Sequence, residues 1–150
     1  EARGFKRQDY ARLHPAGAIG RTLLTRVADI MRTGAAIATI PATARVQDAI
    51  IAMTQAKCGS ACVVDADGGL RGIFTDGDLR RHLTRTPDLL TRPIAGLMTA
   101  HPIRVRRDQL AVDVLQLFER HKIDDLPVVD EADRLVGCID IQDLPRLKIL

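Results

Sequence analysis

The sequence predicts an α+β protein built from two copies of one βαββα unit. The main observation is an internal repeat, in which the segment 72–79 (GIFTDGDL) returns in altered form at 137–144 (GCIDIQDL), a step of 65 residues. The same step relates further pairs: Thr43 with Asp108, Asp48 with Asp113, Val64 with Val129, and Asp65 with Asp130. A second observation is the composition, since 46% of the residues are hydrophobic and only 3% are aromatic. We therefore expect two lobes that share an aliphatic core.

The first copy is expected to run from residue 27 to residue 92. A helical turn over 27–31 and a strand over 37–40 come first, and apolar positions at helical spacing then predict a helix over 46–56 with Thr43 as its N-cap. Apolar runs at 61–64 and 70–74 flank a turn of Gly, Ala and Asp residues, which predicts a β-hairpin. A helix over 76–83 and a polar link over 84–92 complete the unit.

The second copy, residues 93–150, is expected to repeat this order of elements. It opens with a helical turn over 94–98 and a strand over 103–105, and a helix capped by Asp108 then presents an apolar face that includes Val114 and Phe118. Strands over 126–129 and 135–139 form the second hairpin, and a last helix runs from 140 to about 147. Residues 1–26 stand outside the repeat.

Charge and hydropathy exclude several kinds of partner. The 22 basic residues are balanced by 19 acidic ones and are dispersed, which gives a net charge of +3 without a basic helix or an aromatic-interleaved patch. We therefore expect no nucleic-acid partner. No apolar run approaches membrane-spanning length, and the first six residues are not a signal peptide, so a cytoplasmic protein without a membrane partner is expected.

Three cysteines, Cys58, Cys62 and Cys138, are too few for a disulfide framework, which fits a reducing compartment. The spacing Cys58-x-x-x-Cys62 allows a zinc half-site, but no second Cys or His pair stands at a matching distance along the chain. Cys62 and Cys138 also fall in expected strands. We therefore expect small core residues at these positions, with neither a metal nor a cofactor.

Each copy joins a strand to a helix through a polar step, Thr75-x-x-Asp78 in the first and Asp140-x-x-Asp143 in the second. One interpretation is a capping box, in which a side-chain oxygen and an acid three residues later satisfy free backbone N–H groups. The other is a ligand site, because a helix N-terminus attracts phosphate and an acid one turn further can accept hydrogen bonds from a ribose diol. The residue pattern leaves both interpretations open.

Three motifs extend the repeat into a family resemblance: residues 27–31 (VADIM), 126–130 (LPVVD) and 72–79. Over about residues 27–150 the chain resembles a tandem cystathionine-β-synthase (CBS) domain pair. The resemblance implies two repeats packed through their sheets into a disc. It also implies dimerisation of such discs and nucleotide-binding clefts between the repeats.

The stretch 12–21 (RLHPAGAIGR), followed closely by residues 27–31, is similar to the domain junction of bacterial D-arabinose 5-phosphate isomerases. Those enzymes interconvert D-ribulose 5-phosphate and D-arabinose 5-phosphate on the route to Kdo, a sugar of lipopolysaccharide. The resemblance implies that residues 1–26 are the tail of an absent sugar-isomerase domain and that His14 belongs to the active site of the complete enzyme. A neutral imidazole suits proton transfer, but without its partners it catalyses nothing, so the fragment itself is not expected to be an enzyme.

The family pattern also implies ligand contacts residue by residue. Thr75 would contact a phosphate or a ribose hydroxyl and Asp78 would accept hydrogen bonds from the ribose diol, with Asp140 and Asp143 in the matching places of the second copy. Further residues would wall a base pocket or supply charge to a phosphate: Gly59, Ser60, Ala61, Asp125, Leu126, Pro127, Arg80, Arg81 and Arg104.

The identity of the ligand has more than one interpretation. Asp140 stands where the family usually has Ser or Thr, and because an acid repels phosphate, the two clefts are not expected to be equivalent. This acid disfavours a triphosphate and favours CMP-Kdo, the activated product of the pathway, whose carboxylate and phosphate the arginines can pair with. AMP or ATP is the alternative ligand. A different class of function is a ligand-free module that holds a homodimer of CBS pairs, and a tetramer of the complete enzyme.

Overall fold

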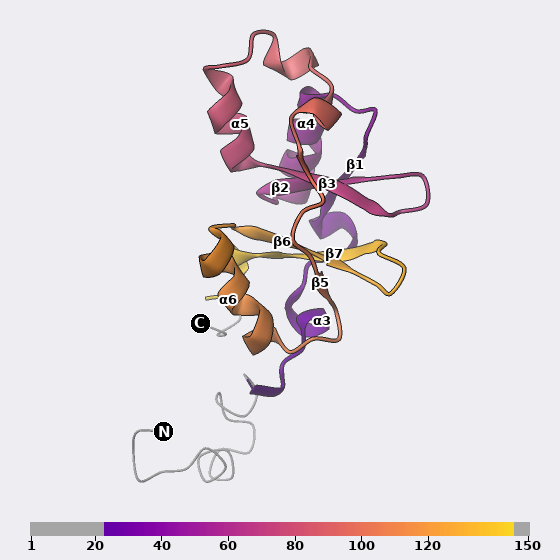
Figure 1. Cartoon of the computed structure of the whole chain (residues 1–150), viewed down its shortest axis with the longest axis vertical. Helices are drawn as coiled ribbons and strands as arrows, with labels where there is room; N and C mark the ends of the chain where they lie inside the picture. Colours follow the sequence, from indigo (N-terminus) through magenta and orange to yellow (C-terminus); the bar gives the residue numbers. More distant parts are fainter. Residues whose placement is uncertain (1–22, 146–150) are drawn as a thin grey trace.

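The computed structural model describes residues 23–145, which form two lobes stacked one on the other (Figure 1). The first lobe holds a sheet with strand order β1-β2-β3-β4, and its elements are β1 (Ala38–Pro41), α4 (Val46–Ala56), β2 (Ser60–Val64), β3 (Leu70–Thr75), α5 (Asp76–Leu83), η2 (Leu89–Thr91), η3 (Ile94–Gly96) and β4 (Thr99–Ala100). β1 and β2 are parallel, and the other neighbours are antiparallel. The expected βαββα order of the first copy is confirmed.

The second lobe repeats this arrangement with a sheet in the order β5-β6-β7. Its elements are α3 (Val27–Ile30), β5 (Val105–Arg106), α6 (Ala111–His121), β6 (Asp125–Val129), β7 (Leu135–Asp140) and the 3₁₀ helix η4 (Ile141–Asp143). A further short helix, η1 (Gly34–Ala36), lies in the connection from α3 to β1. The parallel pairing of β5 with β6 and the antiparallel hairpin of β6 with β7 match the pairings of the first lobe.

Alternation along the strands places one apolar face of each sheet toward a helix and the other toward the opposite lobe. In β2, Ala61 and Val63 belong to the core that α4 covers, whereas Cys62 packs in a separate cluster with Val129 of the second lobe. The hairpin tips are also joined, because Leu70 N donates to the Asp133 carbonyl at 3.1 Å and Leu135 N donates to the Gly68 carbonyl at 3.0 Å. The expected packing of the repeats through their sheets is confirmed.

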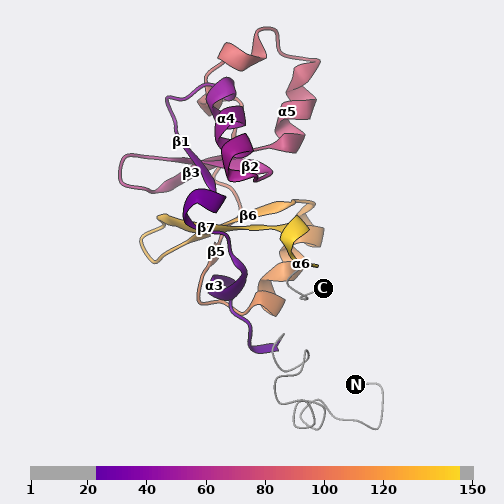
Figure 2. The same cartoon turned by 180° about the vertical axis from the view of Figure 1, so that it is seen from behind.

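The two lobes exchange segments, which the repeat alone did not predict. Helix α3 precedes β1 in the sequence, yet it lies in the second lobe beside α6 in both views (Figures 1 and 2), and Val27 and Ile30 are part of that lobe's core. In return, Ile94 is buried in the core of the first lobe and β4 extends the first sheet. A copy in the sequence is therefore not the same set of residues as a lobe in space.

Two equivalent glycines, Gly72 in β3 and Gly137 in β7, make room for the exchanged segments. A Cβ atom on Gly72 would lie 2.4 Å from Sδ of Met98, and one on Gly137 would lie 2.6 Å from Sδ of Met31. The Cβ of residue 137 would also lie 2.8 Å from the backbone carbonyl oxygen of Arg32. All three distances are shorter than van der Waals contact allows, so a side chain here would displace the segment that crosses over.

We expect Gly137→Ala to lower the free energy of unfolding by about 3 kcal/mol and Gly72→Ala by about 1 kcal/mol, within the usual range for overpacking. The Met98 side chain can rotate away from a new methyl group. The Arg32 carbonyl cannot, because it accepts a hydrogen bond from Cys138 N at 3.1 Å. Urea unfolding of the two variants measures the difference, and equal losses would show that the backbone contact at Gly137 is unimportant.

Some sequence-based expectations about the elements were wrong. Thr43 and Asp108 do not cap helices, since α4 and α6 begin later and have Arg45 and Leu110 at their N-caps. At α4 the Asp48 carboxylate instead accepts a hydrogen bond from Arg45 N at 2.9 Å, so an acid inside the first turn does the capping.

The short strands were the least predictable elements. The strand expected over 103–105 is the two-residue β5, and the two-residue β4 was not expected at all. Strands of two residues are too short to show the alternation of apolar and polar side chains from which a strand is predicted. In the second copy a 3₁₀ turn, η4, replaces the first turn of the helix expected from 140 to about 147, and residues beyond 145 lie outside the described part of the chain.

Candidate functional site

A cavity of about 430 Å³ lies where the first turn of α5 meets the second lobe. This volume falls in the range of small-ligand pockets. The apolar part of its lining comes from three isoleucines, Ile73, Ile103 and Ile123. The charged and polar part includes Asp76, Asp78, Asp124, Asp125, Asp140, Arg80, Arg81, Lys122, Thr75, Thr99, His101 and Gln142. We call this cavity the first cleft.

The first turn of α5 orders the polar groups of the first cleft. Thr75 Oγ1 accepts a hydrogen bond from Asp78 N at 3.1 Å, and Asp78 Oδ2 accepts one from Thr75 N at 2.9 Å. The capping-box interpretation is confirmed for the first copy, whereas in the second copy Asp140 accepts from Gln142 N and Asp143 pairs with Arg32. The ligand role of Thr75 and Asp78 stays a prediction. The Thr75 hydroxyl still has its own proton to donate, because only its acceptor capacity is used.

The other oxygen of the Asp78 carboxylate pairs with Arg81, one turn along the same helix. Asp78 itself is buried, but the Arg81 side chain is 60% exposed. An exposed ion pair of this kind contributes little stability, on the order of 0.5 kcal/mol, and exchanges readily with solvent. A ligand hydroxyl can therefore take the place of Arg81 at small cost.

The structure brings together about half of the residues expected to bind a ligand. Those that line the first cleft are Gly59, Thr75, Asp78, Arg80, Arg81, Asp125 and Asp140. Four others, Ser60, Ala61, Leu126 and Pro127, are buried within β2 and β6 and do not line it. Each strand begins one residue before its apolar run, at Ser60 and at Asp125, so residues that were expected to wall a pocket from the strand ends lie within the sheets.

Arg104 does not line the first cleft either. Its Nη1 atom donates to both carboxylate oxygens of Asp133, at 2.8 and 2.7 Å, and lies 3.5 Å from the Leu70 carbonyl oxygen. These contacts hold the second hairpin tip against the first lobe. His14, the residue implied for catalysis in the complete enzyme, lies outside the described residues.

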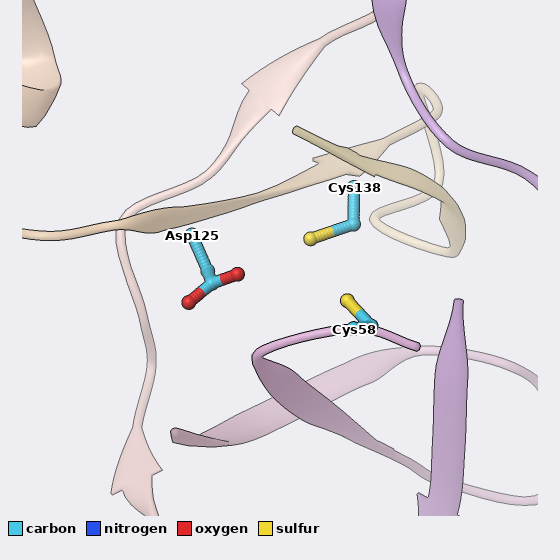
Figure 3. Close-up of side chains that lie close together, drawn as sticks. All are labelled: Cys58, Asp125 and Cys138. Atoms are coloured by element: carbon cyan, nitrogen blue, oxygen red, sulfur yellow. The ribbon is translucent and has the colours of Figure 1, made fainter. Parts of the chain in front are cut away.

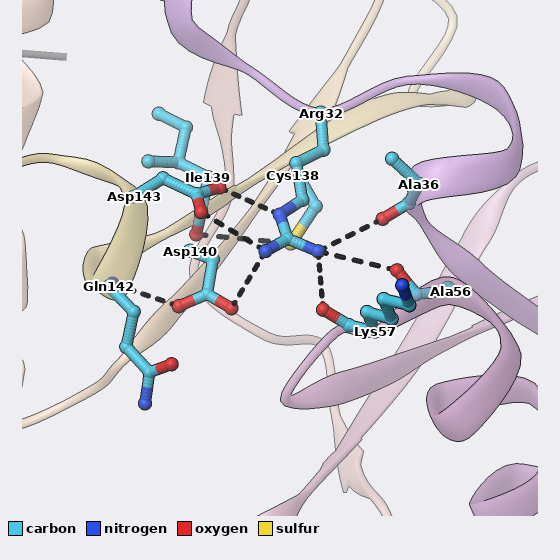
Figure 4. Close-up of polar contacts among 9 residues, drawn as sticks. All are labelled: Arg32, Ala36, Ala56, Lys57, Cys138, Ile139, Asp140, Gln142 and Asp143. Carbon is cyan, nitrogen blue, oxygen red and sulfur yellow. Dashed lines mark hydrogen bonds and ion pairs between the residues drawn. The ribbon is translucent and has the colours of Figure 1, made fainter. Parts of the chain in front are cut away.

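The position equivalent to the first cleft on the opposite side of the interface is filled by the Arg32 side chain (Figure 4). Its guanidinium donates to both oxygens of Asp143, with Nε to Oδ2 at 2.7 Å and Nη2 to Oδ1 at 3.1 Å. Asp140 Oδ2 lies 3.8 Å from Nη2, and Nη1 donates to the Lys57 carbonyl at 2.7 Å. Because Asp143 is the repeat partner of Asp78, Arg32 lies where a ligand of the second copy was expected.

A difference at one pair of equivalent positions accompanies this asymmetry. Met31 and Met98 take equivalent places over Gly137 and Gly72, so the residue after each methionine is also equivalent: Arg32 in one case and Thr99 in the other. Thr99 lines the first cleft and leaves it open. The Arg32 side chain is only 19% exposed, and its hydrogen bond to Asp143 holds the pKa of its guanidinium above the usual value. Because this side chain fills the space, we call the position the closed cleft.

The acid at position 140 has a local explanation that was missed in the sequence. Asp140 was expected to select the ligand, but its Oδ1 atom accepts from Gln142 N at 2.9 Å and its other oxygen faces Arg32. Its charge is therefore partly neutralised from within the chain. The sequence signal for Arg32 is the alignment of Met31 with Met98, which places Arg32 where the other copy has Thr99. An arginine is then available to pair with Asp140 and Asp143, and the first cleft has no equivalent of it.

Buried ionisable groups lie next to the first cleft. Burial, together with the nearby Asp140 charge, raises the pKa of Asp125 to about 8, against the opposing effect of the Ser60 hydroxyl. A hydrogen bond with Cys138 and burial raise the pKa of the Cys58 thiol. Although the Cys58 contact lowers the pKa of Cys138, contact with Cys62 and burial outweigh it and raise that pKa above the usual value. All three cysteines are free and buried.

These features define a class of protein. The model of the CBS domain matches residues 27–85 and 94–147, and the chain belongs to this family as a tandem pair. Across its whole length it is 42% identical to the arabinose 5-phosphate isomerases KdsD of Pseudomonas aeruginosa and Yersinia pestis, and 39% identical to GutQ of Escherichia coli. The aligned regions cover 46%, 45% and 46% of those proteins, so the chain spans about half the length of the curated relatives it matches.

Solved structures of CBS pairs resemble the whole described fold. The CBS domain pair of MJ0100, in complex with 5′-methylthioadenosine and S-adenosyl-L-methionine, has a TM-score of 0.74 and 26% identity over 83% of this chain and 95% of that one. CBSX2 in complex with AMP has a TM-score of 0.68 and 25% identity over 82% and 95% of the two chains. In the described part of this chain, no helix combines the length and the apolar character needed to cross a membrane.

Proposed function

We propose that this chain is the regulatory CBS pair of a D-arabinose 5-phosphate isomerase, and that it senses one nucleotide in its first cleft. In this proposal residues 1–26 join the pair, residues 27–92 and 93–150, to a sugar-isomerase domain that holds the other partners of His14. The match to the C-terminal part of KdsD and GutQ supports the attachment to an isomerase of the Kdo pathway. The chain alone is expected to have no isomerase activity.

The observation that carries the proposal is the open arrangement around Asp78. A buried carboxylate at the start of a helix, a threonine hydroxyl with a free proton and an apolar wall of isoleucines meet in one cavity. The carboxylate suits a ribose diol, the threonine hydroxyl suits a phosphate, and the isoleucine wall suits a base. The exposure of Arg81 leaves this site accessible, whereas the closed cleft already contains a cation bound to Asp143.

The charges of the first cleft favour a ligand with few phosphate groups. Five aspartates and three bases line it, but Asp125, with its pKa raised to about 8, is largely protonated at neutral pH. Four carboxylates then face three cations, so a triphosphate meets a small net repulsion. AMP fits this limit, and the adenosine compounds in the related CBS pairs support it. CMP-Kdo is the second candidate, because Arg80, Arg81 and Lys122 can pair with its carboxylate and single phosphate. The involvement of Asp140 in contacts within the chain weakens the argument that this acid selects CMP-Kdo.

Thermal melting with a panel of AMP, ATP and CMP-Kdo tests the proposed function. A ligand at 100 times its dissociation constant adds about 2.7 kcal/mol to the free energy of unfolding, which raises the melting midpoint measurably. We expect AMP or CMP-Kdo to raise the midpoint and ATP to have a smaller effect. A panel without any shift at millimolar concentration would favour the alternative of a ligand-free oligomerisation module.

We also propose that the chain forms a homodimer through the helical sides of its lobes, and that the complete enzyme is a tetramer. Large apolar side chains are exposed on this side, including Ile51 of α4 at 55% and Leu83 of α5 at 60%. Covering them in an interface of standard size would give a complex that persists at micromolar concentration. Sedimentation velocity is expected to show a dimer at tens of micromolar, and a monomer would count against the proposal.

A further inference from the structure

Three potential metal ligands meet between the lobes: Cys58, Cys138 and Asp125 (Figure 3). The two sulfur atoms and a carboxylate oxygen all lie within 4.8 Å of one another, and all three residues are buried. Cys58 follows α4 in the first lobe, whereas Asp125 and Cys138 belong to β6 and β7 of the second. Cys138 lies opposite Pro127 in the β6–β7 register, so it shares a face of the sheet with Asp125.

The cluster contains polar atoms that the described protein does not satisfy. Oδ1 of Asp125 and Oγ of Ser60 are buried, and in the described part of the chain neither has a partner with hydrogen-bond geometry, although the Ser60 hydroxyl is close enough to lower the pKa of Asp125. Asp125 is 8% exposed and Ser60 is 1% exposed, so bulk water does not solvate them. An unpaired carboxyl oxygen in such a place costs on the order of 1–3 kcal/mol, which a bound cation would remove.

We propose that Cys58, Cys138 and Asp125 bind one zinc-class metal ion that joins the two lobes. Zinc binds thiolate sulfur at about 2.3 Å and carboxylate oxygen at about 2.0–2.2 Å in tetrahedral sites, which places such donors about 3.5–3.8 Å apart. The donors here need to approach one another by only about 1 Å to reach that arrangement. Binding displaces the two thiol protons to solvent and, below a pH of about 8, the carboxyl proton of Asp125 as well, and two thiolates and one carboxylate then hold the ion.

The fourth position and the route of entry follow from the first cleft. Asp125 lines that cavity as well as the cluster, so a hydrated ion can reach the thiols from the cleft and keep one water molecule. The soft sulfur donors favour zinc over magnesium or calcium, which prefer oxygen ligands. Sequence spacing pairs Cys58 with Cys62, whereas the fold brings Cys58 to Cys138, which is why the site is not visible as a motif.

Cobalt binding tests the proposal, because Co²⁺ in a zinc site with thiolates shows intense sulfur-to-metal charge-transfer absorption. We expect the full chain, reduced and freed of metal, to develop this absorption with one equivalent of Co²⁺ and to lose it when Zn²⁺ is added. Cys58→Ser, Cys138→Ser and Asp125→Asn are each expected to weaken zinc binding by about tenfold or more, since even residues that only orient metal ligands have effects of this size. Circular dichroism establishes whether each variant is folded.

Cys62→Ser is the comparison variant, because Cys62 is buried in β2 and contacts Cys138 but is not one of the three proposed ligands. It is expected to weaken zinc binding much less than Cys58→Ser does. The proposal is overturned if the unaltered chain gives no thiolate absorption with Co²⁺, or if Cys62→Ser weakens binding as much as Cys58→Ser. It is also overturned if Cys58 and Cys138 form a disulfide in preference to binding zinc under reducing conditions, as thiol titration and mass measurement would reveal.

Discussion

Arg32→Ala is expected to lower the free energy of unfolding by about 3 kcal/mol, the lower end of the range for breaking a buried ion pair. The substitution leaves the Asp143 carboxylate buried without the two hydrogen bonds it accepts from Arg32 Nε and Nη2. It also removes the donor to the Lys57 carbonyl at the end of α4. The side chain is 19% exposed, so water entering the closed cleft recovers part of the loss.

Arg81→Ala is the control for this prediction, because Arg81 pairs with the equivalent carboxylate, Asp78, in the first cleft. Its side chain is 60% exposed, so its removal is expected to cost less than about 1 kcal/mol. Urea unfolding of both variants gives the comparison. The double variant Arg32→Met, Asp143→Leu should recover most of the stability lost in Arg32→Ala, since apolar residues of similar volume often replace a buried ion pair without loss. Equal costs for the two arginines would contradict the assignment of a closed and an open cleft.

Asp78→Ala is expected to weaken nucleotide binding about ten- to hundredfold. Hydrogen bonds to a charged group contribute on the order of 1.5–3 kcal/mol each, and 1.4 kcal/mol corresponds to a factor of ten. The variant also loses the bond from Thr75 N to the Asp78 carboxylate, with a cost to α5 of about 1 kcal/mol. Calorimetric titration should therefore be performed well below the melting midpoint of the variant.

Asp76→Ala provides the control for binding, because Asp76 is also in the first turn of α5 and lines the same cavity. Removing this acid deletes a charge that repels phosphate, so binding of AMP is expected to be unchanged or tighter. If Asp76→Ala and Asp78→Ala weaken binding equally, the effect comes from the local charge or from α5 rather than from a ribose contact at Asp78.

The repeat predicted the hairpins and the longer helices well, because their length lets apolar periodicity accumulate. It predicted less about how the copies meet. Helix α3 and strand β4 cross to the opposite lobe, and the sequence signals of that exchange are Gly72 and Gly137 with the two methionines that cover them. A glycine in a strand indicates a close approach, but the element that approaches is set by the tertiary fold.

The candidate site was predictable where its residues are consecutive and unpredictable where they are not. Thr75 and Asp78 act within one turn of α5, so their spacing alone identified them. The contact of Arg32 with Asp143 and the cluster of Cys58 with Cys138 join residues from different elements, and neither repeat step nor motif spacing relates them. Pairing Arg32 with Thr99 through the methionines would have indicated that only one cleft is open.

The stoichiometry of nucleotide binding tests the central claim most directly. Titration calorimetry of AMP into the full chain, with CMP-Kdo in a parallel titration, measures the number of ligands per chain. The structure predicts one nucleotide per chain, because Arg32 holds Asp143 in the closed cleft while Asp78 remains accessible. Two nucleotides bound per chain would show that Arg32 does not close its cleft. One nucleotide bound per chain with the same affinity in Asp78→Ala would show that the open cleft had been assigned to the wrong side.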